Sequence, residues 1–316
     1  MTSKAPVRTL QESYWKRLLK NLKSRRSVYL MLVPVIIYYI IFNYLPMYGA
    51  QIAFRDFRST RQGITGAKWV GLENFYDFFN GVYAPRLIRN TLLINTLNLI
   101  FGFPAPIILA LLLNELRSER FKKTVQTISY LPHFISLVVI CGMLKDFLAT
   151  DGIITQMLSA ITGTNLPNLL TNKDYYRAIY VLSDIWQGIG WGAIIYIAAL
   201  SGIDSQLYEA ASIDGAGKWK QMLNVTLPGI LPTIMIMLIM RIGNMMSLGY
   251  EKTLLLYNEG IYETADIIST YVYRAGLLGN QKGLAAAVDL MNSAINLILL
   301  FTANTLSRKF SGSSLW

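Results

Sequence analysis

Runs of about 20 residues without a single charge recur along this chain, and the charges crowd into the gaps between them. Only 15% of the 316 residues are charged, while 53% are hydrophobic. Each run is close to the length that a helix needs to cross the hydrocarbon of a membrane, roughly 20 residues. The pattern predicts an all-α, polytopic membrane protein with six transmembrane helices, at about residues 28–50, 90–114, 124–144, 180–203, 221–248 and 284–307.

A single cysteine, Cys141, and a single histidine, His133, exclude several kinds of chemistry. A chain with one cysteine forms no internal disulfide, and a Cys/His metal cluster needs more ligands than this. His133 lies in an apolar run after a proline, where a structural role is favoured, so we predict no catalytic residue and no metal site. The sequence has no GxxxxGK[ST], HExxH or GxSxG motif. We therefore predict that the chain is not an enzyme, holds no cofactor, and uses ATP only if another chain binds it.

The distribution of basic residues predicts which loops face the cytoplasm. Residues 1–27 contain eight Lys and Arg and loop 115–124 contains four, whereas loop 149–176 contains one. Short loops rich in Lys and Arg stay in the cytoplasm, so both termini are predicted inside and the long loops outside. The net charge of +11 then reflects cytoplasmic loops and anionic lipid head groups, and no nucleic acid is expected as a partner.

Segment 1–27 also repeats apolar residues at helical spacing. Trp15, Leu18, Leu19 and Leu22 fall at i, i+3, i+4 and i+7, with lysine and arginine between them. This spacing predicts a basic amphipathic helix that lies on membrane lipid at the inner interface. A disordered basic tail is the alternative.

Polar residues inside the predicted spans share helix faces, because they recur three or four positions apart. They are Thr91, Asn95, Asn98 and Gly102; Asp184, Gln187 and Trp191; Arg241, Asn244, Ser247 and Glu251; and Asp289, Asn292, Ser293 and Asn296. Polar groups are costly in hydrocarbon and tend to face a bundle interior or a water-filled path. The stripes therefore predict a polar translocation path. Interhelical hydrogen bonds that need no substrate, with an Arg241–Asp289 pair among them, are the alternative.

The segment between the fourth and fifth predicted spans, residues 204–228, has the composition of a docking surface. Asp204 is placed to cap a helix, and a glycine permits a sharp bend before a second short helix. A helix-turn-helix of this size cannot bury itself, so its small residues and one carboxylate are exposed: Glu209, Ala210, Ala211 and Gly215. The segment predicts a knob that docks on a cytoplasmic partner protein.

The same segment resembles the EAA loop of bacterial ABC importer permeases. The match consists of Glu209-Ala210-Ala211, Gly215 after three further residues, Val225 where the family usually has isoleucine, and Leu227-Pro228. Other stretches resemble the branch that imports oligosaccharides derived from complex polysaccharides: WVGLENF at 69–75 followed by Asn90-Thr91-Leu92, NYLPMYGAQIAFRDF at 43–57, NELRSERFKKTVQTISYLPHFIS at 114–136, and the terminal SSLW.

The resemblance implies a type I ABC importer permease in a bacterial cell membrane. Such a permease pairs with a second permease, binds two ATPase subunits that hold ATP and Mg, and receives its sugar from an external solute-binding protein. The coupling residues implied for the ATPase contact are Glu209, Ala210, Ala211, Asp214, Gly215, Leu227 and Pro228.

Sugars are commonly held by aromatic faces and by amide and carboxylate hydrogen bonds. The substrate-path candidates chosen on that ground are Trp186, Gln187, Trp191, Asn244, Asp289 and Asn292. Two other functions stay open: a secondary transporter or channel that works without ATP, and an ABC permease for a solute other than a sugar.

Overall fold

The computed structural model describes residues 25–58 and 63–316, so nearly all of the predicted amphipathic segment 1–27 lies outside the described residues. The chain divides into two compact units, Met1–Gln51 and Ile52–Trp316. Its described part is helical apart from loops and one isolated β-bridge between Arg55 and Trp69. The predicted all-α fold class is confirmed.

The first unit consists of helical segments in direct succession: α2 (Arg26–Tyr39), the π-helical η1 (Ile40–Tyr44), α3 (Leu45–Met47) and the start of the 3-10 helix η2 (Tyr48–Phe54). With the rest of η2 they form one apolar helix of 29 residues, Arg26–Phe54, about 44 Å long at 1.5 Å per residue. Apolar side chains are exposed on all of its faces, which suits a helix surrounded by lipid.

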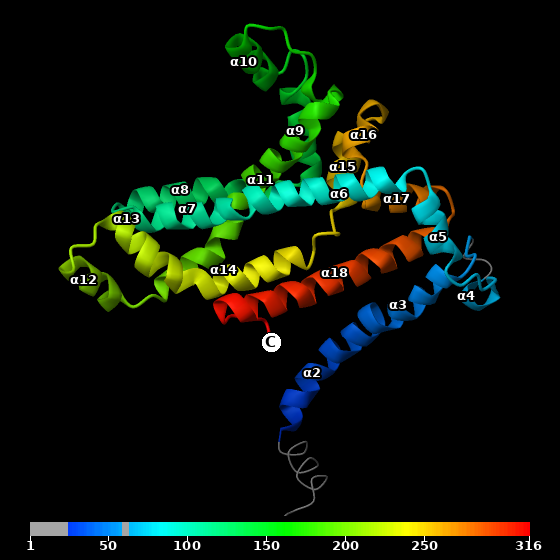
Figure 1. The fold of residues 1–316 in the computed structure, drawn as a ribbon, viewed down its shortest axis with the longest axis horizontal. Helices are drawn as coiled ribbons and strands as arrows, with labels where there is room; N and C mark the ends of the chain where they lie inside the picture. Colours follow the sequence, from blue (N-terminus) through cyan, green and yellow to red (C-terminus); the bar gives the residue numbers. More distant parts are fainter. Residues whose placement is uncertain (1–24, 59–62) are drawn as a thin grey trace, which may run out of the picture. The chain divides into compact units, whose positions relative to one another are not determined.

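The second unit begins with short helices on a loop and continues through the first of its long helices (Figure 1). In order these are α4 (Gly63–Gly66), α5 (Glu73–Asn80), α6 (Ala84–Leu97), the π-helical η4 (Asn98–Gly102), α7 (Pro104–Glu115), α8 (Glu119–Tyr130), the 3-10 helix η5 (Leu131–Phe134), α9 (Leu137–Phe147), α10 (Ile153–Thr162), η6 (Leu169–Thr171) and α11 (Lys173–Ser201). α6, η4 and α7 run on without a break, and α11 packs along α7.

The rest of the second unit contains two long helices that lie side by side, α14 and α18 (Figure 1). The elements are α12 (Ser205–Ile213), α13 (Lys218–Gln221), the π-helical η7 (Met222–Thr226), α14 (Leu227–Ile242), α15 (Tyr250–Leu256), η8 (Glu259–Ile261), α16 (Tyr262–Ala265), α17 (Ile268–Val272), η9 (Tyr273–Leu278) and α18 (Lys282–Ser311). α13, η7 and α14 form one continuous helix of 25 residues.

Five helices among the described residues are long and apolar enough to cross a membrane, or six if one bent pair counts as a single span. The bent pair lies where we predict the third span, at 124–144. Helix Glu119–Phe134 and helix Leu137–Phe147 meet there at 98°. Pro132 has no backbone N–H to continue the ladder, and the Ser136 hydroxyl caps the new helix by accepting the Val139 N–H.

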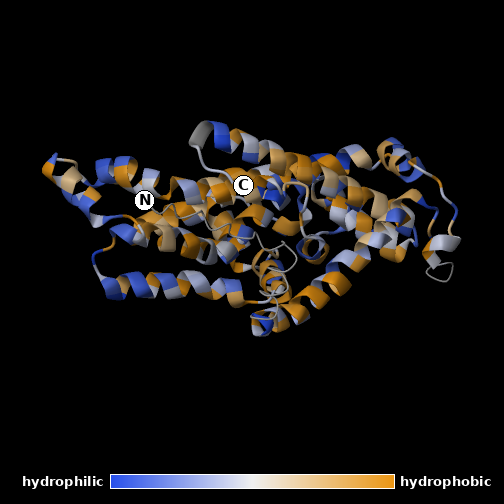
Figure 2. Ribbon diagram, turned by 90° about the horizontal axis from the view of Figure 1, so that it is seen from below, coloured by the Kyte–Doolittle hydropathy of each residue, from blue (hydrophilic) through white to orange (hydrophobic). Residues whose placement is uncertain are grey.

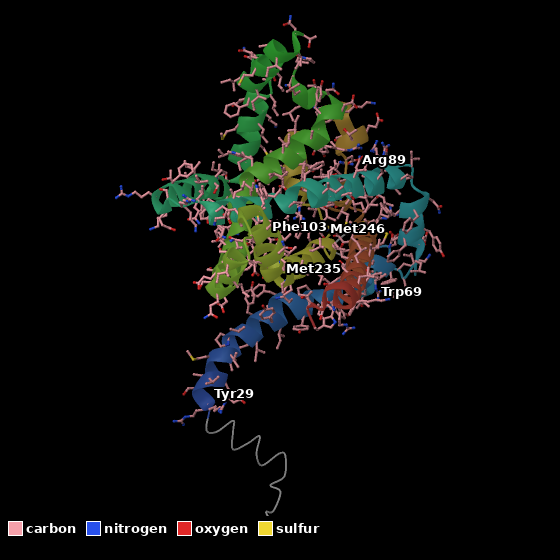
Figure 3. The ribbon with its side chains drawn as sticks, turned by 60° about the vertical axis from the view of Figure 1, so that its left-hand side comes forward. Tyr29, Trp69, Arg89, Phe103, Met235 and Met246 are labelled. Atoms are coloured by element: carbon pink, nitrogen blue, oxygen red, sulfur yellow. The ribbon has the colours of Figure 1, made fainter. Side chains whose placement is uncertain are left out.

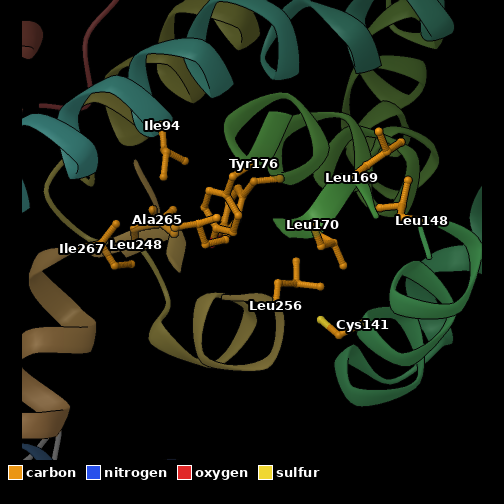
Figure 4. Packing of buried hydrophobic residues seen from close by; sticks show 12 residues of the cluster. Ile94, Cys141, Leu148, Leu169, Leu170, Tyr176, Leu248, Leu256, Ala265 and Ile267 are labelled. Carbon is orange, nitrogen blue, oxygen red and sulfur yellow. The ribbon is translucent and has the colours of Figure 1, made fainter. Parts of the chain in front are cut away.

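The core of the second unit is divided among small clusters rather than gathered in one interior. Figure 4 shows the largest, in which Tyr176 of α11 meets residues of α6, α9 and the segment after α14. Many large apolar side chains remain exposed on the helices, and Figure 2 shows hydrophobic residues along their outer faces. This distribution fits helices whose outer faces contact lipid.

One close crossing depends on a glycine. A Cβ atom on Gly190 of α11 would lie 2.1 Å from the carbonyl oxygen of Ser129 in α8. The absence of a side chain at Gly190 therefore lets the backbones of α8 and α11 meet.

Candidate functional site

The α12 knob (residues 204–217) has well-defined ends. The Asp204 carboxylate accepts the Gln206 N–H at 2.9 Å and caps α12. At its other end the chain reverses at Gly215, whose φ of +75° is in the left-handed region that favours glycine. The Ala216 N–H then donates to the Ala211 carbonyl at 2.8 Å and closes the turn.

Side chains fix this knob to the long helix that follows it. The Gln221 amide is buried, and its Nε2 donates to the Ser212 hydroxyl at 2.9 Å and to the Ala216 carbonyl at 3.0 Å. One turn further on, the Tyr208 and Thr226 hydroxyls are hydrogen-bonded at 3.0 Å. The knob and the helix of α13, η7 and α14 are thereby held together as one piece.

The residues predicted for the partner contact lie mostly on the outer side of the knob. Glu209, Ala210, Asp214 and Gly215 are exposed, whereas Ala211 is half-buried. Apolar side chains extend the exposed surface, since Ile213 is 86% exposed and Leu207 is 54% exposed. Leu227 and Pro228 lie apart from this surface, in the first turn of α14. The surface is free to receive a partner.

Sequence reasoning missed two residues beside the knob. A cavity of about 530 Å³ lies between α12, α13 and the end of α7, and Glu209 and Ile213 line it. On its rim Lys218 forms an ion pair with Glu115 at 3.3 Å. Both charges were visible in the sequence, but 103 positions separate them and no local pattern joins them.

Two adjoining cavities, of about 560 and 300 Å³, lie between the long helices. We call them the polar cavities because they share polar lining residues, although apolar side chains cover more of the wall of the larger one. Four residues line both of them: Asn98, Asp184, Arg241 and Ser247. They come from η4, α11, the end of α14 and the turn that follows. Phe103 and Asn244 also line the larger cavity, and Phe103 is labelled in Figure 3. Three of the four predicted polar stripes therefore converge.

An ion pair and an amide hold the wall between these cavities. The two oxygens of Asp184 have different partners: Asn98 Nδ2 donates to Oδ2 at 2.9 Å, and Lys252 Nζ lies 3.3 Å from Oδ1. The Lys252 side chain is only 5% exposed, and it also donates to the Tyr180 carbonyl at 3.1 Å. Sequence reasoning did not select Lys252, because it lies outside the predicted spans.

The structure disperses the predicted substrate-path residues of α11. Trp186 lines a separate, apolar cavity of about 680 Å³ between α9, α10 and α11. The Gln187 amide donates to the Ile135 carbonyl at 3.5 Å. The Trp191 ring stacks on His133 with ring centres 4.4 Å apart. None of these three is among the residues that line the two polar cavities.

Part of the polar stripe of α18 makes hydrogen bonds to another segment of the chain, as the alternative to a translocation path predicts. Asn296 accepts the Met246 N–H and donates to the Ser247 hydroxyl, both at 2.8 Å, so it joins α18 to the segment after α14. Asn292 is buried, and neither it nor Asp289 lines the polar cavities. Arg241 and Asp289 are both described, and the structure has no ion pair between them. The suggested pairing of these two residues is wrong.

A buried carboxylate fixes the segment between α14 and α18. Asp266 is 0% exposed, and its oxygens accept from Arg86, Arg274 and the Thr270 hydroxyl at 2.8 to 3.0 Å. Burial lowers the pKa of the Arg274 guanidinium, but its hydrogen bonds to Asp266 and Tyr257 outweigh burial and raise that pKa above its usual value. Arg274 therefore remains charged.

A second contact fixes the same segment at the surface. Lys173 Nζ lies 2.7 Å from Glu263 Oε2, and this hydrogen bond and charge hold the pKa of the Glu263 carboxyl below its usual value. The Asn90 amide donates to the Glu263 and Asp266 carbonyls at 3.0 and 2.9 Å. Residues 257–274 are thus tied to α6 and α11.

Comparison with known proteins places this geometry in a family. The chain is 43% identical over 301 residues to the polygalacturonan/rhamnogalacturonan transport system permease protein YteP of Bacillus subtilis (strain 168), covering 95% of this chain and 94% of that protein. It also matches a chain in the crystal structure of a bacterial alginate ABC transporter in complex with alginate pentasaccharide-bound periplasmic protein. That match has a TM-score of 0.86 and 41% identity, and covers 95% of this chain and 100% of that one.

A second solved structure, of a bacterial ABC transporter involved in the import of the acidic polysaccharide alginate, matches with a TM-score of 0.85 and 41% identity over 93% of this chain and 99% of that one. Residues 102–312 match the family described as binding-protein-dependent transport system inner membrane component. That range contains the α12 knob and most of the residues that line the two polar cavities. The chain is a member of this family, a permease of an ABC transporter.

Proposed function

We propose that this chain and a second, different permease form the path by which an oligosaccharide enters the cell. An external solute-binding protein delivers the sugar, and two cytoplasmic ATPase subunits drive the transport. ATP and Mg bind to those ATPases and no cofactor binds here. The closely similar relatives are permeases named for polysaccharide transport, which supports a sugar rather than another solute.

The main structural support for this proposal is the continuous helix from Lys218 to Ile242, which connects the knob to the larger polar cavity. The α12 knob is fixed to its first turns, and Arg241 and Asn244 line the larger polar cavity at its other end. A partner that pulls on the knob therefore moves the wall of the cavity, because an α-helix of this length transmits displacement along its axis. A transporter that works without ATP would have no use for such a connection.

In this proposal the exposed side of the knob docks in a groove of the ATPase. Glu209 offers the charge that pairs with a basic residue there, and Ala210 and Gly215 let the backbones approach closely. Asp214 and the half-buried Ala211 complete the docking surface, and Leu227 and Pro228 begin the helix behind it. α18 runs toward the side of the unit on which the knob lies (Figure 1), which supports a cytoplasmic C-terminus.

Co-purification tests the ATPase contact. The tagged chain is expressed with its neighbouring genes and purified in mild detergent, and the proteins that accompany it are identified by mass spectrometry. Glu209→Lys is expected to remain in the membrane but to lose the ATPase and sugar uptake. Glu259→Lys is the matched control, since it makes the same charge change at an exposed residue of η8. Retention of the ATPase and of uptake by Glu209→Lys would overturn the proposal.

A further inference from the structure

We propose that Arg241 binds the carboxylate of an acidic sugar unit inside the translocation path. This inference rests on the proposed function, because it names the chemical class of the sugar. Arg241 lies in the last turn of α14 and lines both polar cavities. It is exposed in the structure, so a ligand in the cavities can reach its guanidinium.

Arg241 has no ionic partner among the described residues, although a carboxylate lies nearby. Asp184 lines the same two cavities, but its ion pair is with Lys252 and its amide partner is Asn98, and the structure has no ion pair between it and Arg241. A guanidinium within a membrane span is costly unless it meets water or an anion. The C-terminal end of a helix favours a positive charge. Lysine would meet that need as well as arginine does, so the helix end alone does not explain the guanidinium of Arg241.

The other groups of the cavities suit a ligand that carries hydroxyls as well as an anion. Asn244 Nδ2 is occupied by the Met240 carbonyl at 2.9 Å, which leaves its oxygen as an acceptor. Ser247 and the exposed Glu251 line the smaller cavity together with Arg241, and Glu251 forms no ion pair with it among the described residues. Among the described residues that line these cavities, Arg241 is a cation without an ion-pair partner and lies beside several acceptors, which matches a sugar unit that has one carboxylate and several hydroxyl donors.

Guanidinium geometry explains why the site would distinguish acidic from neutral sugars. Arginine presents parallel N–H donors that match the two oxygens of a carboxylate, and such bidentate pairs are stronger than hydrogen bonds between neutral groups. A neutral sugar loses this pair but keeps its hydroxyl contacts. The solved relative that imports the acidic polysaccharide alginate is consistent with a path of this kind.

Binding to the whole complex tests the inference. The probes are a trisaccharide of galacturonate and the same trisaccharide after reduction of its carboxyl groups. Their equilibrium binding is measured on the purified complex of permeases and ATPases without the solute-binding protein. The unmodified complex is expected to prefer the acidic probe. Arg241→Gln is expected to weaken binding of the acidic probe about 10- to 100-fold, the value of a charge-assisted bidentate pair, and to leave the neutral probe unchanged.

Two further variants make the result specific. Arg241→Lys keeps the charge at the helix end but not the planar geometry, so it is expected to recover only part of the preference. Arg308→Gln removes an exposed charge from the last turns of α18, outside both cavities, and is expected to change nothing. The inference is overturned if the unmodified complex has no preference, or if Arg241→Gln affects both probes equally. Co-purification of the ATPase still tests the proposed function in either case.

Discussion

Removing the buried Asp266 carboxylate is expected to lower the stability of the second unit strongly. Its Oδ2 accepts from Arg86 at 3.0 Å and from Arg274 at 2.8 Å. Its Oδ1 accepts from Arg274 and from the Thr270 hydroxyl, both at 2.8 Å. Asp266→Ala removes all four hydrogen bonds and leaves two guanidinium groups without their anion.

The structure sets the size of this effect. Removing one partner of a buried ion pair costs about 3–5 kcal/mol. Asp266 is 0% exposed, but the Arg86 and Arg274 side chains are 32% and 28% exposed, so water compensates part of the loss. We therefore expect a cost near 3 kcal/mol, at the lower end of that range. Asp266→Asn keeps one acceptor oxygen and is expected to cost less.

Thermal unfolding of the purified complex measures this cost. One kcal/mol shifts the Tm of a domain of 150–250 residues by about 2–4 °C, so Asp266→Ala is expected to lower Tm on the order of 10 °C. Glu263→Gln is the matched control, because it breaks an ion pair of the same segment that lies at the surface. In that pair the Lys173 side chain is 47% exposed and the Glu263 side chain is 61% exposed. If Asp266→Ala lowers Tm no more than Glu263→Gln does, the buried network is not what holds this segment.

Two further predictions concern stability. Gly190→Ala is expected to prevent stable folding, because its Cβ would meet the Ser129 carbonyl oxygen at 2.1 Å, whereas Gly188→Ala has nothing within 4 Å and is expected to leave Tm unchanged; equal Tm values for the two would contradict the crossing. The depressed pKa of Glu263 means that its pair with Lys173 stabilises the fold above the unfolded pKa, near 4.3, and that this contribution disappears as pH falls through the folded pKa. The Tm difference between the unmodified protein and Glu263→Gln is therefore expected at pH 7, should shrink as pH falls below the unfolded pKa of about 4.3, and should vanish only below the lower folded pKa.

The helices and the α12 knob could be predicted because their signals are local. An uncharged run long enough to span a membrane needs no knowledge of its neighbours. The knob depends on Asp204 and Gly215, whose roles as a cap and a turn are properties of short segments. The bend in the third span is also local, since Pro132 lies just before the break and Ser136 lies in it. The prediction of one straight span at 124–144 missed the bend because it considered only the length of the uncharged run.

The pairings that complete the candidate site could not be predicted, because they join distant parts of the chain. Asp266 meets Arg86 across 180 positions, and Lys252 meets Asp184 across 68. Helical spacing says which residues share a face but not which way that face turns. The polar residues of α18 do share one helix face, as the spacing predicts. Asn296 on that face, however, binds the segment after α14 and does not line either of the polar cavities.

The connection between the knob and the cavity yields a prediction that separates coupling from folding. The helix Lys218–Ile242 has 25 residues and is about 37 Å long at 1.5 Å per residue. The Tyr208–Thr226 hydrogen bond fixes the knob to it at 3.0 Å. Tyr208→Phe removes one hydroxyl from this contact and keeps the ring, so the cost in stability is about 1 kcal/mol.

The effect of Tyr208→Phe on transport is expected to be larger than this cost suggests. In the proposed mechanism the knob must move together with α14, and a loosened knob lets the ATPase hydrolyse ATP while α14 stays in place. The complex should therefore assemble and hydrolyse ATP, but import less sugar per ATP in proteoliposomes. Tyr76→Phe removes a hydroxyl from a tyrosine that is 63% exposed and serves as the control. If both variants import equal sugar per ATP, this hydrogen bond does not transmit the motion, and the coupling must rely on the packing of α12 and on Gln221.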